Sequence, residues 1–535
     1  MPEPTTETQS EPSTVPLPQP IRTQLSDFSH FTGSLDKTET PPSAGPGAFD
    51  PTVIPPSHKS RTIILCFDGT GDQFDTDNSN IIQFFSMLKK DDKSQQVVYY
   101  QAGIGTYTIP EIATPFWSNV QKKIDMAIGN HLDAHVMGGY EFLMENYHAE
   151  DKICIFGFSR GAYTARALAG MLHKVGLLPA GNHQQIPFAY KMFSRDDPTG
   201  WKQSNAFKKA FSMNVEIEFV GVWDTVCSVG IVPRTLPFTA SNTSIRYFRH
   251  AISLDEHRAK FKANYYHLRH PEDEKGIKPG EMPRSNQRFP HYHRKNHQHH
   301  HKSRMHSDEE YDDGLTETNV LEVWFAGCHC DIGGGSVPNG TRNSLARIPL
   351  RWMIRQCFDV KTGIQFHYDS FIDIGLDPNT VYPIVTKRPA ALIPSADTVA
   401  EAKVSAHTVE PSDATLTNEA EASPITASTF KSEEDEELVD ALCPIYDQLK
   451  LAKAWWILEL LPLRHHAQNR ENLSWNPYWQ VNLGHARRIP GPVRERKEKI
   501  RVHRSVKIRL EAEGLEGGKY EPLAKFEHLD FEWED

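Results

Sequence analysis

The stretch DKICIFGFSRGAYTARALAGML, residues 151–172, decides the fold. Its apolar run KICIFGF predicts a buried strand, and the alanine-rich segment behind it has helical spacing. Between them, GFSRG matches the pattern G-x-S-x-G, in which a serine stands on a sharp strand-to-helix turn. Gly157 and Gly161 leave room for the strand and the helix to approach closely. The stretch therefore predicts that Ser159 projects above the edge of a sheet as a nucleophile.

Apolar runs and amphipathic segments alternate on both sides of this turn. Such alternation predicts an α/β fold, with a mostly parallel central sheet that is covered by helices on both faces. The predicted strands are 63–67, 96–103, 152–158, 215–226 and a run that starts at 319; the predicted helices are 81–90, 127–148, a segment from 160 that Gly176 ends, and 250–261.

Two further residues follow predicted strands in the order that a hydrolase needs. A serine hydroxyl requires a base, and that base requires an orienting acid. Asp224 follows the run EFVGVW, and His329 follows the run LEVWFAG. The order Ser, Asp, His is that of α/β-hydrolases, and the carboxyl ends of parallel strands are where such sheets bind ligands. We therefore expect Ser159, Asp224 and His329 to form a catalytic triad.

Each candidate also has a structural interpretation. Asp224 can cap a turn or a helix, and His329 can be a buried histidine whose hydrogen bonds are purely structural. Asp255, in SLDEHR, is a rival acid. Its helical pattern with Glu256 and Arg258 favours surface ion pairing instead.

The oxyanion of the reaction needs main-chain N–H donors. The N–H of Arg160, at the start of the predicted helix, is the first candidate. The loop in CFDGTGD is expected to donate a second N–H from around Gly69 and Thr70, with Asp68 bracing the loop. The same stretch is similar to the D-x-D-G-T pattern of haloacid-dehalogenase-type phosphatases. Because Cys66 stands where their nucleophilic aspartate belongs, we do not favour that class.

Composition narrows the classes of function. The formal net charge of −11 argues against general nucleic-acid binding and against broad adsorption to anionic membranes, although local basic patches stay possible. No apolar run is long enough for a transmembrane segment, and the first residues do not resemble a signal peptide. Seven scattered cysteines indicate reduced thiols and a cytoplasmic location. Cys328-His329-Cys330 lacks a second pair at zinc spacing, so no metal site is predicted.

Long polar segments divide the chain. Residues 1–57 and 391–438 are rich in polar residues and proline and cannot bury enough apolar surface, so we expect both to be disordered. The catalytic domain is predicted over 58–390. It contains a histidine-rich insertion at 270–317, interpreted as a solvated surface segment, with opportunistic metal binding as the alternative. Residues 439–535 are expected to pack on this domain.

The segment ALCPIYDQLKLAKAWWILELLPL, residues 441–463, allows three interpretations. Its aromatic and leucine side chains can form part of the core, an apolar lip over the active site, or a peripheral membrane contact. The sequence alone favours core packing.

Five segments together resemble a known family: CFDGTGD, GFSRGAYTARALAGML, GVWDTV, SLDEHRAKF and VWFAGCHCDIGGG. They are similar to an uncharacterised hydrolase domain of many fungal proteins, which also forms the catalytic part of type VI secretion phospholipase effectors in bacteria. The resemblance spans roughly residues 60–360. It implies an α/β-hydrolase-like fold and cleavage of phospholipid acyl esters, with Ser159, Asp224 and His329 in the three catalytic positions.

Together these observations predict a serine esterase or lipase that works through an acyl-enzyme, with lipid or phospholipid as the implied substrate and no cofactor. A different class of function stays open. The amount of sequence expected to be disordered is also consistent with a catalytically silent interaction module, whose polar arms recruit partners.

Overall fold

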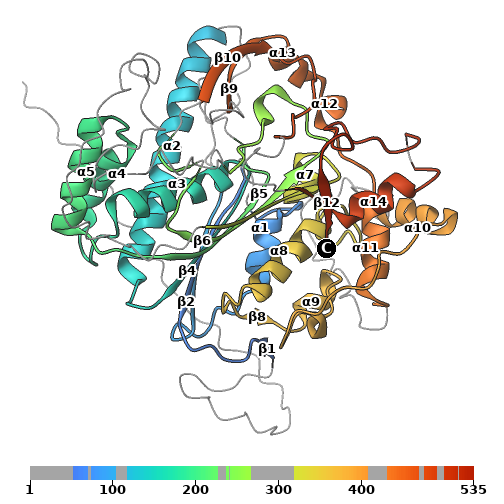
Figure 1. The fold of residues 1–535 in the computed structure, drawn as a ribbon, viewed down its shortest axis with the longest axis horizontal. Coiled ribbons are helices and arrows are strands. Elements are labelled where there is room, and N and C mark those ends of the chain that lie inside the picture. The colour runs from blue at the N-terminus through green and yellow to red at the C-terminus, as the bar shows by residue number, and fades with distance from the viewer. Residues whose placement is uncertain are drawn as a thin grey trace, which may run out of the picture. The chain divides into compact units, whose positions relative to one another are not determined.

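The computed structural model describes residues 52–69, 74–103, 117–226, 236–239, 241–266, 318–407, 430–468, 475–490, 499–515 and 517–535 (Figure 1). The predictions of disorder before residue 52 and of a solvated histidine-rich insertion concern residues outside these ranges.

Eight of the described strands form one sheet, in the order β12-β11-β7-β6-β5-β4-β2-β3 (Figure 1). Every neighbouring pair in it is parallel. The predicted α/β class with a parallel central sheet is therefore confirmed. The strands are β2 (Thr62–Phe67), β3 (Gln96–Gln101), β4 (Lys152–Phe158), β5 (Ile217–Trp223), β6 (Ile245–Ser253), β7 (Asn319–Phe325), β11 (Ile500–His503) and β12 (Phe531–Glu534).

Successive side chains along the central strands enter two separate apolar cores. In β2, Ile64 and Cys66 belong to one core, and Ile63 and Leu65 belong to the other. Both faces of the sheet are therefore buried, as in parallel sheets generally. One face is covered by α1 (Asn80–Met87), α8 (Arg347–Asp359), α11 (Glu433–Leu442) and α14 (Arg504–Glu511), and the other by α2 (Trp117–Asn146), α3 (Ser159–Val175) and α4 (Ile186–Ser194), with α5 (Pro198–Phe211) beside them (Figure 1).

The direction in which the chain crosses the sheet reverses at β2. The next strand, β3, lies on one side of β2, whereas β4, β5, β6 and β7 follow one another on its other side. In open α/β sheets, ligands bind at such a point, beyond the carboxyl ends of the strands. Phe67 ends β2 and Phe158 ends β4, so Ser159 stands at this position.

The predicted helix at 250–261 is wrong. Its first residues lie in β6, which pairs with β5 and β7, and its last three form the short 3₁₀ helix η2 (Ala259–Phe261). Ala251, Ile252 and Ser253 are all buried. A strand that is buried on both faces lacks alternating polarity, and over so short a run its pattern is easily confused with that of a buried helix.

Part of the segment at 391–438 is ordered, contrary to the sequence prediction. It contains α10 (Ala396–His407) and the start of α11. The sequence predicts that the acidic run in α11 is too polar to be ordered. In the structure, Glu437 of this run is buried between two arginines. Its carboxylate lies 3.0 Å from Arg388 and 2.6 Å from Arg504. Charge pairing therefore lets the acidic face of this helix be buried together with its apolar residues Leu438, Val439 and Leu442.

Strands near both ends of the described chain pair with strands from other parts of the sequence. Val53 in β1 (Val53–Ile54) pairs with His367 in β8 (Phe366–His367), so order begins inside the segment predicted to be disordered. At the other end, β11 pairs with β7 through Arg501 and Val323. The C-terminal part of the chain thus extends the central sheet as well as packing against it. No helix within the described ranges is long and apolar enough to cross a membrane.

Candidate active site

Ser159 stands on a tight turn between β4 and α3, as predicted from the GFSRG pattern. Its φ angle of 58° is in the left-handed region. A Cβ atom on Gly161 would lie 2.3 Å from the carbonyl oxygens of Phe67 and Asp68, and one on Gly157 would lie 2.6 Å from the carbonyl oxygen of Gly161. The two glycines therefore let the start of α3 approach the end of β2, which brings Ser159 to the switch point of the sheet.

The structure brings the three predicted residues together. The Nε2 atom of His329 lies 2.7 Å from the Oγ atom of Ser159, and its Nδ1 atom lies 2.5 Å from Oδ2 of Asp224. All three side chains are buried. The arrangement is a continuous hydrogen-bond chain from a hydroxyl through an imidazole to a carboxylate.

Asp224 follows β5 and is also held in an unusual conformation. Its φ angle is 41°, and the main-chain N–H of Ser253 donates a hydrogen bond of 3.0 Å to its Oδ1 atom. Among the described non-glycine residues, six have a positive φ angle, and two of these are Ser159 and Asp224. Such strain is stored preferentially at functional sites, because the surrounding structure has to maintain it.

Arg487 is the contact that sequence reasoning missed. Its guanidinium donates hydrogen bonds of 2.5 and 2.8 Å to the two carboxylate oxygens of Asp224. It also bonds to the carbonyl oxygens of Phe261 and Ser253, and its side chain is buried. In the sequence this arginine lies in the run HARR, which has the appearance of an exposed basic segment. No local signal connects it to Asp224, 263 residues away.

The charges of the site favour a neutral imidazole beside an ionised carboxylate. Burial opposes the ionisation of Asp224, but the positive charge of Arg487 and the hydrogen bond with His329 hold the pKa of Asp224 well below its usual range. Burial lowers the pKa of His329, and the hydrogen bond to Asp224 only partly offsets this effect. Because the carboxylate can only accept, Nδ1 of His329 carries the proton and Nε2 accepts from the Ser159 hydroxyl.

Two aromatic rings and a carboxylate hold His329 in place. The ring of Phe158 lies 4.7 Å from the imidazole and the ring of Phe261 lies 4.8 Å from it, between ring centroids. The main-chain N–H of His329 donates to Glu256 over 3.3 Å. A Cβ atom on Gly333 would lie 1.9 Å from the Phe158 ring, so the glycine run after His329 lets Phe158 pack there.

Comparison with known proteins identifies the family. The profile described as "T6SS, Phospholipase effector Tle1-like, catalytic domain" matches residues 61–356. The chain belongs to this family. The matched range contains Ser159, Asp224 and His329, whereas Arg487 lies outside it.

This Tle1-like chain is similar to a yeast protein and matches two solved structures more weakly. The uncharacterized protein YEL023C of Saccharomyces cerevisiae (strain ATCC 204508 / S288c) is 27% identical over 604 aligned residues, which cover 91% of this chain and 83% of that protein. A crystal structure of an uncharacterized protein from Pseudomonas aeruginosa matches at 18% identity and a TM-score of 0.29, over 57% of this chain and 46% of that one. The Tle1 effector bound to the VgrG spike from the Type 6 secretion system matches at 17% identity and a TM-score of 0.24, over 52% and 51%. The similarity thus spans about half of each solved chain.

Asp255, the alternative acid in this Tle1-like domain, forms none of the hydrogen bonds that His329 makes in the site. Its carboxylate accepts from the main-chain N–H of Gly327 over 2.7 Å and from the hydroxyl of Tyr520 over 2.7 Å. Burial raises the pKa of Asp255. The predicted surface ion pairing of Asp255 is wrong, because Asp255 is buried. Its neighbours Glu256 and Arg258 do pair, at 2.8 Å, and both are buried as well.

Asp68 braces the loop that follows β2. Its Oδ1 atom accepts hydrogen bonds from the main-chain N–H of Gly69, over 2.8 Å, and from the hydroxyl of Ser79, over 2.6 Å. Its Oδ2 atom accepts from the hydroxyl of Tyr100 over 2.8 Å. Burial raises the pKa of Asp68, and these three donors oppose that rise. The carboxylate therefore fixes the loop at the carboxyl end of β2, beside the start of α3.

The predicted oxyanion donors differ in their positions. Arg160 lies in the first turn of α3, immediately after Ser159, where main-chain N–H groups point out of the helix end. The N–H of Gly69 is directed to Asp68 in this conformation. Thr70 lies outside the described residues. Of the three, Arg160 is the residue that lies at the start of a helix directly after Ser159.

Metal binding at Cys328-His329-Cys330 has no geometric support. The thiol of Cys328 donates to the carbonyl oxygen of Asp255, and burial raises its pKa well above the ordinary value. Within the part of the chain that the structure describes, no group of three or more His, Cys, Asp or Glu side chains is arranged to hold a metal ion.

Proposed function

We propose that this chain is a serine hydrolase that cleaves carboxylic esters, with acyl esters of lipids or phospholipids as its substrates. The observation that carries the proposal is the hydrogen-bond chain from Ser159 through His329 to Asp224, at 2.7 and 2.5 Å. Membership of a family of phospholipase effector catalytic domains supports the choice of a lipid ester.

The proposed reaction runs in two steps. Nε2 of His329 removes the proton from Ser159 as its Oγ atom attacks the ester carbonyl, and Asp224 stabilises the imidazolium that forms. The N–H of Arg160, at the positive end of α3, stabilises the oxyanion. The imidazolium then protonates the departing alcohol and leaves an acyl-enzyme. Water, deprotonated by His329, attacks this ester and restores the serine hydroxyl.

Labelling with a fluorophosphonate probe tests the proposal, because the probe reacts with activated serines. We expect the wild-type chain to be labelled and Ser159→Ala to remain unlabelled. Ser204→Ala provides a matched control, since Ser204 is also buried but bonds to the carbonyl oxygen of Trp201 in α5. This variant should label like the wild type.

Turnover of lipid esters tests the substrate class. We expect Ser159→Ala and His329→Ala each to lose roughly four orders of magnitude in activity. A loss of less than about tenfold for His329→Ala would remove His329 from the mechanism. If the folded wild-type chain stays unlabelled and hydrolyses no ester in a panel of lipids, the interaction-module interpretation replaces this one. The cytoplasmic location stays a prediction from the cysteine pattern.

A further inference from the structure

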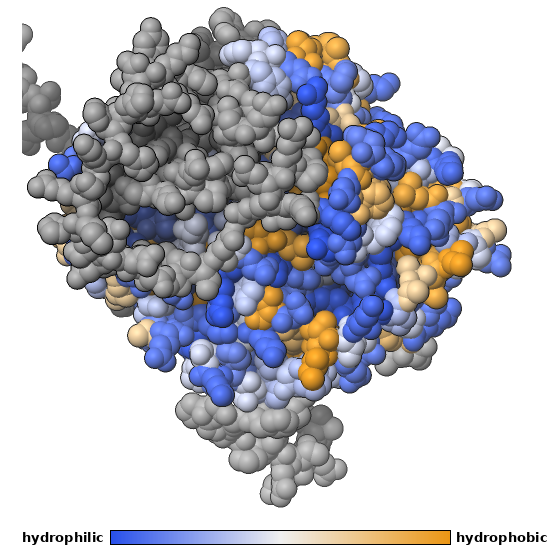
Figure 2. Space-filling view, viewed as in Figure 1, coloured by the Kyte–Doolittle hydropathy of each residue, from blue (hydrophilic) through white to orange (hydrophobic). Residues whose placement is uncertain are grey.

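Large apolar side chains are exposed around α13 (Trp456–Glu459), α12 (Gln448–Leu451) and the end of β10 (Trp475–Val481), which pairs with β9 (Pro462–Gln468). Apolar surface is visible over α13 at the top of the view in Figure 2. The sequence favoured core packing for much of this segment. We call these residues the α13 surface; each is between 38% and 69% exposed, and they are Leu451, Trp456, Ile457, Leu460, Leu461, Trp479, Val481 and Leu483.

Hydrogen bonds join the two stretches of chain into one surface. The carbonyl oxygen of Glu459 accepts from the N–H of Leu483 over 3.2 Å, and its buried carboxylate accepts from the N–H of Gly484 over 2.9 Å. Pro462 at the start of β9 lies opposite Val481 at the end of β10. The apolar side chains that follow α13 therefore lie beside those that follow β10.

The charged groups around this surface are mainly basic. Within residues 448–490, the exposed basic residues that the structure describes are Lys450, Lys453 and Arg488, in a chain whose net charge is −11. Arg487 is buried against Asp224, and Glu459 is also buried. Lys450 and Lys453 are exposed at the edge of the apolar side chains. The surface thus combines tryptophan and leucine side chains with lysines, the composition of interfacial membrane segments.

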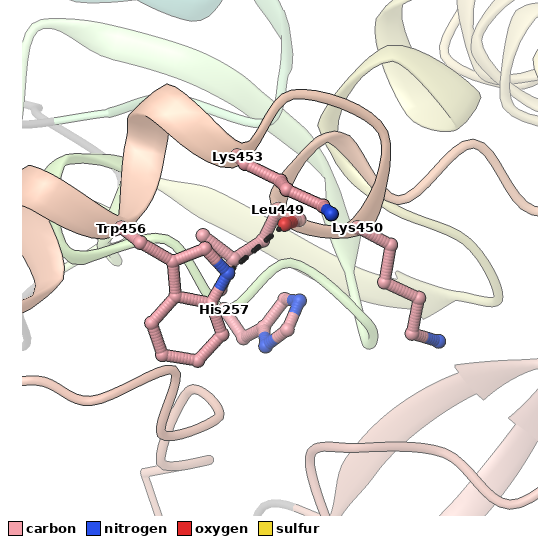
Figure 3. Close-up of a pocket in the computed structure, with 5 residues that line it drawn as sticks. All are labelled: His257, Leu449, Lys450, Lys453 and Trp456. Carbon is pink, nitrogen blue, oxygen red and sulfur yellow. Dashed lines mark hydrogen bonds between the residues drawn. The ribbon is translucent and has the colours of Figure 1, made fainter.

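A pocket of about 540 Å³ opens among these residues. Figure 3 shows Trp456 and Lys450 at opposite ends of it, with His257 between them. The imidazole of His257 bonds to Asp447 over 2.9 Å. Asp447 also lies 3.4 Å from Lys450, so one carboxylate stands against the two lysines and the histidine that line the pocket. This excess of basic groups beside apolar walls fits an anionic headgroup whose acyl chains lie against the neighbouring apolar residues. The pocket is completed by Leu449 and Lys453.

Trp455, the residue before α13, packs against the candidate active site. The ring of Trp455 lies 5.4 Å from that of Phe261, which in turn contacts His329. The guanidinium of Arg258 lies over the Phe261 ring at 3.5 Å and over the Trp455 ring at 4.9 Å. One layer of aromatic side chains therefore separates the exposed segment from the imidazole.

We propose that the α13 surface docks the protein on an anionic phospholipid interface, with its apolar side chains entering the acyl boundary and Lys450 and Lys453 binding headgroup phosphates. A second copy of the chain is a poorer occupant, because a symmetric contact brings the lysines of both copies into one interface and adds no acidic partner for them. The choice of a lipid rests on the proposed function. Docking itself requires no hydrolysis, so the docking proposal and the hydrolase proposal can fail separately.

Sedimentation with phospholipid vesicles tests this surface on the full chain carrying Ser159→Ala, which leaves the lipid intact. Vesicles of phosphatidylcholine alone are compared with vesicles that also contain phosphatidylserine. We expect the chain to bind the anionic vesicles more tightly. Adding Ile457→Asp and Leu460→Asp should weaken binding to both at least about tenfold, because two apolar side chains no longer enter the acyl boundary. Lys450→Gln with Lys453→Gln should cost roughly 25-fold on anionic vesicles and little on neutral ones, at about fivefold per lysine.

Ile393→Asp is the matched control. Ile393 is 81% exposed but lies in the loop before α10, outside the α13 surface. It should bind vesicles like its parent. Equal losses in this control and in the Ile457→Asp and Leu460→Asp variant would overturn the proposal, as would a parent chain that does not sediment with anionic vesicles. Thermal unfolding shows whether each variant is folded, and Trp479→Ser, at a side chain 69% exposed, replaces any variant that is not.

Two further results separate the alternatives. A dimer of the parent chain that the Ile457→Asp and Leu460→Asp variant abolishes, without any vesicle binding, would assign the surface to self-association and overturn lipid docking. Vesicle docking by a wild-type chain whose Ser159 cannot be labelled would uphold the docking surface and refute the proposed hydrolase.

Discussion

Arg487 holds both carboxylate oxygens of Asp224, from a segment 263 residues further along the chain. The arginine keeps Asp224 ionised in a fully buried position and fixes which oxygen faces His329. It also reduces the tendency of the Asp224–His329 pair to bind a proton, because its positive charge lies beside them. In the proposed mechanism Arg487 is thus a positioning residue, which acts on His329 through Asp224.

The first prediction concerns the acid limb of the pH profile. The proposed base works only when it is neutral, so activity is lost as the pH falls through the pKa of His329. Since that pKa is lowered in the folded chain, the midpoint of the acid limb of kcat/KM should lie below about pH 6.5. Arg487→Met should move it upward by about one pH unit or more, because the compensating cation is lost.

Arg487→Lys serves as the control, since it retains the charge but not the two-pronged geometry. Its acid limb should stay near that of the wild type, while its plateau activity falls. If Arg487 had a structural role alone, Arg487→Met would lower the plateau activity and leave the midpoint of the acid limb unchanged. That outcome would contradict the prediction.

The second prediction separates the two buried aspartates. Asp224→Asn should reduce kcat by roughly four orders of magnitude, because the amide favours the wrong tautomer of His329. Asp255→Asn should reduce kcat by less than about tenfold, and lower stability by about 1–3 kcal/mol as its amide faces the N–H of Gly327. Steady-state kinetics and thermal unfolding measure both effects. The opposite order of kinetic losses would make Asp255 the acid.

The third prediction concerns the charges buried under α11. Burial alone would raise the pKa of Glu437, but Arg388, His503 and Arg504 hold it well below the usual range. Glu437→Gln should therefore cost about 3–5 kcal/mol of unfolding free energy at neutral pH, because the buried Arg388 and Arg504 lose the carboxylate that binds both of them. A lowered pKa contributes stability above the unfolded value, about 4.3, and loses it as the pH falls further.

Denaturant titrations at several pH values measure this difference. The difference in unfolding free energy between the wild type and Glu437→Gln should be constant around neutral pH and should become smaller below about pH 4.3. Glu511→Gln, which removes an exposed partner of Lys507 in α14, should cost less than about 1 kcal/mol. Similar costs for the two variants would show that the buried pairs are not coupled to stability.

The fourth prediction tests the close approach of α3 to β2. Gly161→Ala should destabilise the chain by about 1–3 kcal/mol and strongly reduce labelling of Ser159, because the new methyl group meets the carbonyl oxygens of Phe67 and Asp68 at 2.3 Å. Gly138→Ala is the matched control in α2, where the nearest atom lies 3.4 Å from the added Cβ. It should be neutral or slightly stabilising. Normal labelling of Gly161→Ala would show that the turn can relax.

Much of the sheet and of the site could be predicted because its signals are local. The strand at 152–158, the glycines around Ser159 and the apolar runs before Asp224 and His329 each indicate a structure within a few residues. The strand β6 was missed for the same reason. A strand buried on both faces has no polar alternation, and its identity depends on β5 and β7 beside it.

The charged segments could not be interpreted locally. The acidic run of α11 and the basic run that contains Arg487 both look solvated in the sequence. Burial becomes favourable only when residues from distant parts of the chain supply the opposite charge, as Arg388 and Arg504 do for Glu437. Composition alone therefore overestimates disorder in such segments.

By itself, the sequence determined the parallel α/β class, the strand-to-helix turn at Ser159 and the order of the three candidate residues, since each depends on periodicity, small side chains or position after a strand. Tertiary structure alone decided that Arg487 holds Asp224, that Asp255 bonds elsewhere, and that the leucines and tryptophans around α13 are exposed. These features depend on which distant surfaces meet, because burial and ion pairing are properties of contacts between elements rather than of any one segment.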